Sequence, residues 1–219
     1  MFKIIIKEST DLYSGLNDSD DILNKYALKL KKIGYDVQGR KYLGGGTMGD
    51  AFLLSSGKVL KVTEDSSEAK SSAIIAGKET TYLARIEKVF KFGTTGQFGI
   101  VMENLNNISK EEMAFWDELS DTHFLKDILT SPKPWKKVEP ELKRRWIEEW
   151  DKKTVNQFLN NCKKYGFPQM LDELYKYGIT FDDFHGENIM KRGKLSVVID
   201  LGYSKQTKEP KIPVLEKAL

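Results

Sequence analysis

The stretch Phe181-Asp-Asp-Phe-His-Gly-Glu-Asn-Ile-Met190, followed by Val197-Val-Ile-Asp-Leu-Gly202, decides how the chain is interpreted. The first segment is polar, and the second is a short apolar run that ends in an acid and a glycine. Lys191-Arg-Gly-Lys194 lies between them and predicts a hairpin turn. The hairpin would gather the side-chain oxygens of Asp183, Asn188 and Asp200 at one end. Convergent carboxylate and amide oxygens favour a hard cation such as Mg²⁺.

A second motif lies upstream, in Leu43-Gly-Gly-Gly-Thr-Met-Gly-Asp-Ala51. Its glycines follow the spacing G-x-G-x-x-G at Gly44, Gly46 and Gly49. A dinucleotide-binding fingerprint needs a helix after the glycines. Here an alternating strand pattern follows instead, and the next predicted strand, 59–62, carries Lys61 among apolar neighbours. Because glycine has no Cβ, backbone N–H groups in such a hairpin can approach phosphate closely.

The next predicted element is a helix from Ser66 to Ala76, with Asp65 as its cap and a glycine at its end. Glu68 lies in the first turn, where it fits a capping box with Asp65. It is also a candidate ion-pair partner for Lys61, and the two roles are compatible. Only seven residues separate Lys61 from Glu68, so the connection from strand to helix must be tight. Glu79 is the rival partner, and we prefer Glu68.

The remaining pattern predicts an α+β protein. We expect a strand at 2–8, a helix capped by Ser19, strands at 83–92 and 98–103, and a mostly helical region at 108–180 with a long helix at about 141–164. The predicted first lobe is 1–104, a five-stranded antiparallel sheet with one helix, preceded by an extension at 1–34. The predicted second lobe is 105–219, and it is reduced and mostly helical.

Composition excludes several classes of protein. The chain has 219 residues, of which 35 are basic and 32 acidic, so the net charge is only +3. That balance argues against a nucleic-acid partner. The single cysteine, Cys162, excludes an internal disulfide and fits a reducing compartment. No apolar run is long enough to span a membrane. We therefore expect a cytoplasmic protein, in a host cytoplasm if a phage encodes it.

In the order and spacing of these motifs, residues 42–204 resemble the protein-kinase-like phosphotransferases. The motifs are LGGGTMGDA (43–51), VLK (59–61), IVMENL (100–105), FDDFHGEN (181–188) and IDLG (199–202). The catalytic stretch is similar to small serine/threonine kinases encoded by bacteriophages, and also to the aminoglycoside and choline kinases. The resemblance implies a bilobal fold, with ATP and Mg²⁺ in the cleft.

The resemblance also implies roles for individual residues. Asp183 would orient the acceptor hydroxyl or take its proton, and His185 would either touch the γ-phosphate or only stabilise the loop. Asn188 and Asp200 would hold the metal. Lys61, held by Glu68, would bind phosphate. The adenine would meet residues of the first lobe and of the segment that follows it: Ala51, Val59, Met102, and the backbones of Glu103 and Leu105.

Three departures from protein kinases leave the acceptor open. Phe181-Asp182 replaces the usual His-Arg, so switching through a phosphorylated loop is not expected. The A-P-E motif is missing, and 17 residues follow Gly202, too few for the usual peptide-docking helices. A host or phage protein Ser/Thr hydroxyl is the first acceptor hypothesis, and a small molecule is the second. The sequence is also compatible with a pseudokinase that serves as a binding module, and with a kinase-like enzyme that transfers AMP.

Overall fold

The computed structural model describes residues 13–122, 125–202 and 204–216, and it divides into two compact units. The first unit holds 13–78, 85–104 and 210–216, and the second holds 79–84 and the described part of 105–209. The sequence pattern predicts 79–84 in the first lobe and 210–219 in the second, whereas in the structure 79–84 groups with the second unit and 210–216 with the first. The strand expected at 2–8 lies outside the described residues.

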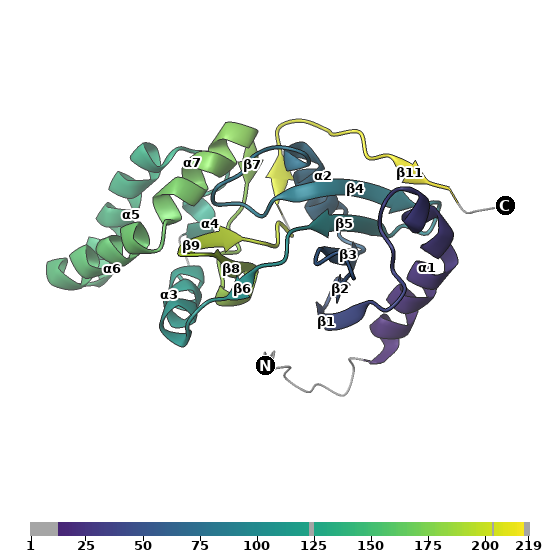
Figure 1. Ribbon diagram of the computed structural model, residues 1–219. Helices are drawn as coiled ribbons and strands as arrows, with labels where there is room; N and C mark the ends of the chain where they lie inside the picture. The colour runs from purple at the N-terminus through teal and green to yellow at the C-terminus, as the bar shows by residue number, and fades with distance from the viewer. Residues whose placement is uncertain (1–12, 123–124, 203, 217–219) are drawn as a thin grey trace. The chain divides into compact units, whose positions relative to one another are not determined.

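The first unit is built on a six-stranded sheet (Figure 1). Its strands are β1 (Lys41–Gly46), β2 (Gly49–Leu53), β3 (Val59–Thr63), β4 (Ile86–Phe92), β5 (Phe98–Met102) and β11 (Val214–Leu215). They lie in the order β1-β2-β3-β5-β4-β11. The first five pair antiparallel, whereas β11 is parallel to β4. The expected five strands are therefore joined by a sixth from the C-terminal segment.

Two helices belong to this unit. The helix α1 (Tyr13–Lys32) packs on the sheet and buries one face of it, through a core that joins Leu23, Tyr26 and Leu30 to strand residues such as Leu60 and Val62. Ser19 does not cap α1, because the helix begins six residues earlier. The helix α2 (Ser66–Ile75) contacts β4 and β5, and the Asp65 carboxylate caps it by accepting the Ser67 N–H at 2.7 Å.

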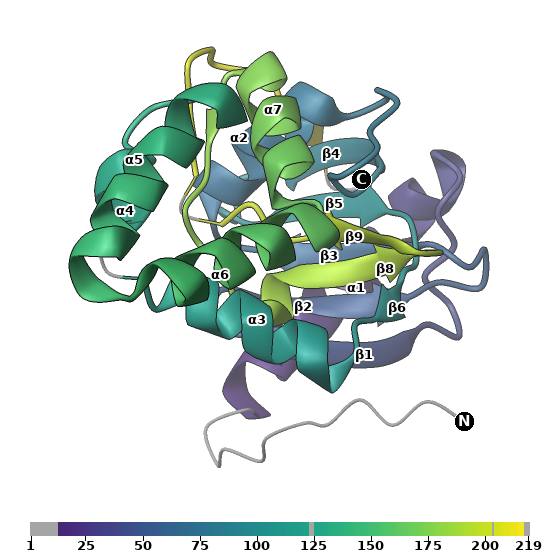
Figure 2. The ribbon, with the colours of Figure 1, turned by 90° about the vertical axis from the view of Figure 1, so that its left-hand side faces the viewer.

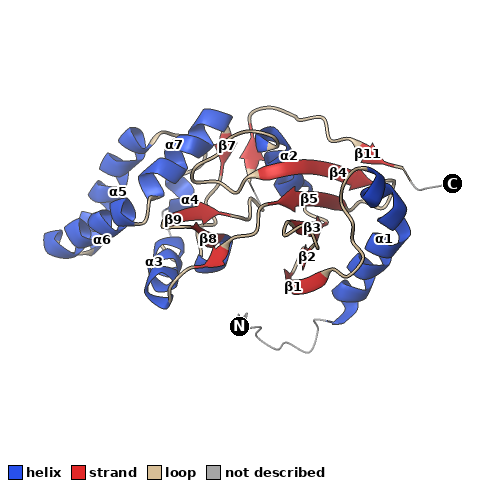
Figure 3. Cartoon of the chain, in the orientation of Figure 1, coloured by secondary structure: helices blue, strands red, loops and turns tan. Residues whose placement is uncertain are grey.

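The second unit is mostly helical (Figure 3). Its helices are α3 (Lys110–Ser120), α4 (Leu125–Ile128), α5 (Trp135–Glu149), α6 (Lys152–Lys164) and α7 (Phe167–Tyr177). The long helix expected at 141–164 is in fact two helices. The chain turns extended at Trp150, and Asp151 then caps α6 by accepting the Lys153 and Thr154 N–H groups. Asp, Ser and Asn side chains favour such caps over helix interiors because they bond nearby N–H groups.

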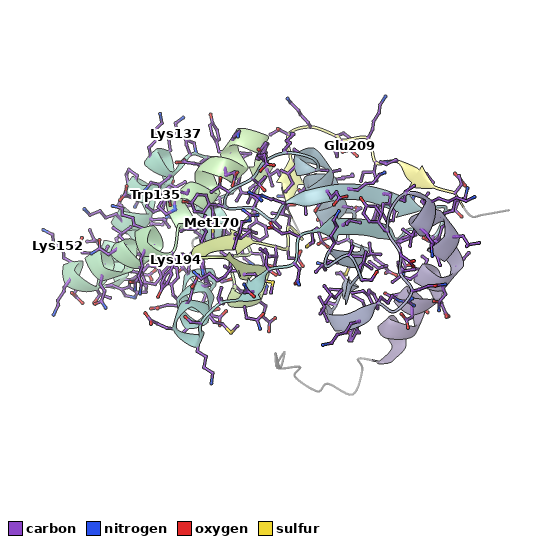
Figure 4. All side chains as sticks on the ribbon, viewed as in Figure 1. Trp135, Lys137, Lys152, Met170, Lys194 and Glu209 are labelled. Carbon is purple, nitrogen blue, oxygen red and sulfur yellow. The ribbon has the colours of Figure 1, made fainter. Side chains whose placement is uncertain are left out.

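Two small sheets complete the second unit. β6 (Asn106–Asn107), β8 (Ile189–Arg192) and β9 (Leu195–Val198) form a three-stranded sheet, with β8 and β9 joined by the predicted hairpin turn (Figure 2). β7 (Ile179–Thr180) pairs with β10 (Lys205–Gln206). Met170 is fully buried among the helices of this unit, whereas Lys137 and Lys152 are exposed (Figure 4). No helix in the described part of the chain is both long and apolar enough to cross a membrane.

Candidate functional site

The residues expected to line the nucleotide share one face of the first unit's sheet. Ala51 is the cross-strand partner of Lys61, and Val59 is the partner of Met102. Cross-strand partners point to the same face, as do residues two apart on one strand. Val59 and Lys61 therefore join the two pairs into one set, on the face opposite the core shared with α1. The sheet register thus gathers four of the predicted residues.

The glycine-rich motif forms the β1–β2 hairpin, with Gly46 paired to Gly49 and a two-residue turn at Thr47-Met48. A Cβ on Gly49 would overlap the Val62 carbonyl, so the close approach of β2 to β3 requires glycine there. The tip of the hairpin is also fixed. The Met48 carbonyl accepts the Glu64 N–H at 2.8 Å and the Thr63 hydroxyl at 3.2 Å.

Lys61 forms an ion pair with Glu68, the preferred partner. The Lys61 Nζ lies 2.7 Å from the Glu68 Oε1, and the two side chains are only 16% and 2% exposed. Glu68 reaches the lysine from the first turn of α2, and the Asp65 N–H of the expected capping box donates to the Thr63 hydroxyl at 3.1 Å. The pair would hold the ammonium in a fixed place on the sheet face that carries Ala51, Val59 and Met102.

The segment after β5 bears on the adenine prediction. Met102 is buried at the end of β5, and the Glu103 N–H donates to the Arg85 carbonyl at 3.2 Å. The Glu103 carboxylate accepts the Arg85 N–H at 2.7 Å. Because the Glu103 N–H is already bonded, an adenine contact at this residue would fall to its carbonyl. Leu105 groups with the second unit.

In the second unit, the loop 183–188 gathers three predicted residues. The Asn188 side-chain amide donates to the Asp183 carbonyl at 2.9 Å and to its Oδ2 at 3.1 Å. The His185 Nε2 lies 3.5 Å from the same Oδ2. The Asn188 N–H donates to the His185 carbonyl at 3.0 Å, at the end of a short 3₁₀ turn, Gly186–Asn188. The carboxylate of Asp183 is therefore held from two sides.

The electrostatics of this loop follow from those contacts. The hydrogen bond from His185 is the main reason that the pKa of Asp183 falls below its ordinary value, with help from Asn188 and the Lys126 charge. The same bond raises the pKa of His185, and the charges of Asp183, Glu187 and Asp117 add to the rise. Each group stabilises the charged form of the other. Asp183 is thus a carboxylate at neutral pH.

Asn188 and Asp200 form the candidate metal position. The Ile199 N–H donates to the Asn188 carbonyl at 2.9 Å, which brings Asp200 alongside Asn188. The Asn188 amide nitrogen faces Asp183, and no described residue donates a hydrogen bond to its Oδ1. An amide oxygen and a carboxylate are ligands that Mg²⁺ accepts, with phosphate and water completing its shell. The donor set therefore fits the ion, although no three His, Cys, Asp or Glu side chains gather as a metal cluster among the described residues.

The supports of the loop were not visible in the sequence. Phe184 is fully buried and packs on Phe167, Phe181 and Trp116 at centroid distances of 5.0, 4.9 and 6.3 Å. The Asp117 carboxylate on α3 accepts the Gly186 N–H at 2.8 Å. Phe181 belongs to the same motif as Phe184, but Trp116, Asp117 and Phe167 lie outside it, and no local pattern marks them.

The hairpin beside the loop is anchored by buried charge. The Glu112 carboxylate on α3 lies 2.7 Å from the Lys191 Nζ and accepts the Ser196 hydroxyl. The Ser109 hydroxyl caps α3 by accepting the Glu112 N–H at 3.2 Å. Arg192 donates to the carbonyls of Thr80, Thr81 and Leu83, which holds the segment 79–84 in the second unit.

The second unit also has an acidic hollow of about 540 Å³ beside α3. It is lined by Ala114, Asp117, Glu118, Asp121, Thr122, Glu149 and Trp150. Asp117 connects this hollow to the loop 183–188 through its hydrogen bond to Gly186. Asp117 therefore both lines the hollow and contacts the backbone of that loop.

No protein-family model and no curated protein matches the chain. Among solved structures, it is similar to a thermostable mutant of aminoglycoside phosphotransferase APH(4)-Ia in its apo form, with 13% identity and a TM-score of 0.38 over 82% of this chain and 71% of that one. It is also similar to that mutant in a ternary complex with AMP-PNP and hygromycin B, with 14% identity and a TM-score of 0.40 over 81% and 70%. Because these identities and TM-scores are low, the function has to follow from this chain's own residues.

Proposed function

We propose that the chain is an ATP-dependent phosphotransferase that moves the γ-phosphate of ATP to a hydroxyl group. The observation that carries the proposal is the loop 183–188. There an ionised Asp183 is fixed by Asn188 and His185, beside the oxygens of Asn188 and Asp200. The glycine-rich hairpin and the buried Lys61–Glu68 pair of the first unit are further support, because they suit a nucleotide's phosphates.

Each residue has a role in the transfer. The acceptor oxygen attacks the γ-phosphorus while the bond to the bridging oxygen of the β-phosphate breaks, and ADP leaves. Asp183 orients the acceptor hydroxyl and takes its proton. Lys61 and the backbone N–H groups of the hairpin offset the phosphate charge. Such reactions depend mainly on positioning and on charge stabilisation.

Asn188 and Asp200 would hold Mg²⁺, which would neutralise charge on the phosphates when bound. The amide nitrogen of Asn188 is used to fix Asp183, so one side chain would serve both the metal and the catalytic acid. The contact of His185 with Asp183 supports a role in holding the loop, in addition to any contact with the γ-phosphate.

The first acceptor that we propose is a Ser or Thr hydroxyl of a protein. Phe181-Asp182 stands where protein kinases usually have His-Arg, and the Phe181 side chain is buried against Phe184. A loop held by aromatic packing needs no phosphate–arginine pair to order it, which supports an enzyme without that form of switching.

A small cationic alcohol is the second candidate acceptor. The acidic hollow on α3 and α5 favours it, since carboxylates there would attract ammonium groups and Asp117 links the hollow to the catalytic loop. An extended neutral peptide would gain less from that charge.

Mass spectrometry after incubation with ATP and Mg²⁺ separates these outcomes. The enzyme is offered a cell lysate in one arm and a panel of polyamino alcohols in the other. Phosphate gained by proteins supports the first acceptor, and phosphate gained by an amino alcohol supports the second. An acceptor that gains AMP would show that the enzyme transfers the nucleotide and not the γ-phosphate. No transfer, together with no thermal shift from ATP and Mg²⁺, would contradict the enzyme and indicate a binding module.

A further inference from the structure

Asp50, which follows the last glycine of the glycine-rich motif, points away from the sheet face that carries Lys61. Asp50 is the cross-strand partner of Val62, whose side chain belongs to the core shared with α1, so Asp50 faces α1 as well. It is only 7% exposed. Its Oδ2 accepts the Ser19 hydroxyl at 2.6 Å, and its Oδ1 accepts the Tyr42 hydroxyl at 3.1 Å. Ser19 comes from α1, 31 residues away, and is itself 4% exposed.

These two bonds are strong restraints because the acceptor is a buried carboxylate. Hydrogen bonds to an ionised group are shorter and stronger than neutral ones, and a buried carboxylate that loses a donor is costly to the fold. Burial, and then the charge and hydrogen bond of Asp50, raise the pKa of Tyr42 to about 12. Tyr42 therefore remains a donor across the physiological range.

Because Asp50 lies within the glycine-rich hairpin, the hydrogen bonds that it accepts from Ser19 and Tyr42 restrain the hairpin backbone. Asp50 directly follows Gly49, and Tyr42 precedes Gly44 across the bulge in β1. A Cβ on Gly45 would overlap the Asp50 Oδ1, so the backbone of the motif rests directly on this carboxylate. The tip of the hairpin is held separately, by the Met48 carbonyl. The hairpin is therefore restrained by α1 at Asp50, whose pair with Gly45 lies next to the turn, and at the turn itself by the end of β3.

We propose that Ser19, Tyr42 and Asp50 are positioning residues for nucleotide binding, which hold the glycine-rich hairpin on α1 in the conformation that receives the phosphates. This inference rests on the proposed function. A hairpin that is already ordered avoids the entropy cost of ordering on binding. The helix α1 would thus position the hairpin from the opposite face of the sheet as well as cover that face.

The test compares two alanine variants at neighbouring residues of α1. Ser19→Ala removes the donor to Asp50. Asp20→Ala removes the ion pair with Arg40, 2.7 Å from Nη2 to Oδ1, and leaves the Asp50 contacts in place. Amide hydrogen exchange of the nucleotide-free protein should become faster across 44–50 in the first variant and stay near wild type in the second. The dissociation constant for ATP with Mg²⁺ should rise about tenfold in the first variant only, as expected for one charge-assisted hydrogen bond.

Tyr42→Phe provides a second variant, which also serves if Ser19→Ala does not fold. It keeps the ring contact with Phe52, at a centroid distance of 5.6 Å, and removes only the hydroxyl. We expect a raised KM for ATP with kcat unchanged, since only binding is lost. Exchange and affinity changes no larger than those of Asp20→Ala would overturn the inference. If the wild type binds no ATP, the proposed function fails, and exchange across 44–50 alone then decides whether the restraint exists.

Discussion

The two units hold their candidate site residues by different forces. In the first unit, the restraints are polar groups removed from water. They are the Lys61–Glu68 ion pair and the hydrogen bonds that the Ser19 and Tyr42 hydroxyls donate to Asp50. In the second, the loop 183–188 is held by aromatic packing around Phe184 and by the Gly186 N–H bond to Asp117. Hydrogen bonds and charges are directional, whereas aromatic packing depends on filled volume.

This difference determines which residues can be changed without loss of the fold. A buried ion pair can be replaced by apolar side chains of similar size, with little or no loss of stability. The backbone of the loop 183–188 packs tightly on its neighbours, and no side-chain substitution can replace that packing. Stability and function should therefore separate in the first unit and change together in the second.

The largest expected effect on stability is in the first unit, at the ion pair. Lys61→Met removes the ion-pair partner of the buried Glu68 carboxylate, so the free energy of unfolding should fall by about 3–5 kcal/mol. Urea unfolding measures the loss. The double variant Lys61→Met/Glu68→Leu should recover most of it and still fail to bind ATP. Recovery of ATP binding along with stability would show that the pair is only structural.

A smaller effect is expected at the close approach of the loop to α3. A Cβ on Gly186 would lie 2.6 Å from the Met113 Cγ and 3.1 Å from its Cα and carbonyl oxygen. Gly186→Ala should therefore cost about 1–3 kcal/mol of stability and also lower kcat, because the loop must shift. Unfolding and transfer assays on the same sample measure both.

Gly193→Ala is the matched control for that variant. Gly193 has φ +63° in the hairpin turn, and no atom lies within 4 Å of an added Cβ. Gly193→Ala should lower the free energy of unfolding by about 1–2 kcal/mol, from backbone conformation alone, and leave kcat unchanged. Equal kcat in the two variants would contradict the dependence of the reaction on loop position.

The smallest effect is on the titration of the loop itself. Because the pKa of His185 is raised above 6.5, its bond with Asp183 is fully formed below that pH and is lost as pH rises through the raised pKa. The lowered pKa of Asp183 means that its contribution exists above about 3.8 and is lost as pH falls through the lowered value. NMR titration of the metal-free protein should place the His185 pKa above 6.5, and Asp183→Asn should return it toward that value. An unchanged pKa in the variant would show that Asp183 is not the cause.

Local sequence patterns predicted the parts of the site whose partners are close in the chain. Lys61 and Glu68 are seven residues apart, and the hairpin that brings Asp200 to Asn188 spans one turn, so spacing alone constrained both. The contacts of Asp117 with Gly186 and of Ser19 with Asp50 span 69 and 31 residues. They depend on how helices dock on the loop or sheet, which no local pattern encodes.

The helix boundaries illustrate the same limit. The apolar pattern across 141–164 continues through Trp150, so it predicted one helix. The side chain of Asp151 instead bonds the N–H groups of the next turn, and it starts a new helix there. The segment 79–84 was expected in the first lobe because it lies between two of that lobe's elements. Three bonds from Arg192 assign it to the second unit.

The most direct test of the proposed chemistry compares Asp183→Asn with Asp182→Asn in transfer of labelled γ-phosphate from ATP. The two variants remove the same charge at adjacent positions, and only Asp183 contacts Asn188 and His185. We predict that Asp183→Asn lowers kcat roughly 10²- to 10⁴-fold, the range for loss of a positioned general base. Asp182→Asn should remain close to wild type. Equal transfer by the two variants would contradict the assignment of Asp183 and, with it, the proposed function.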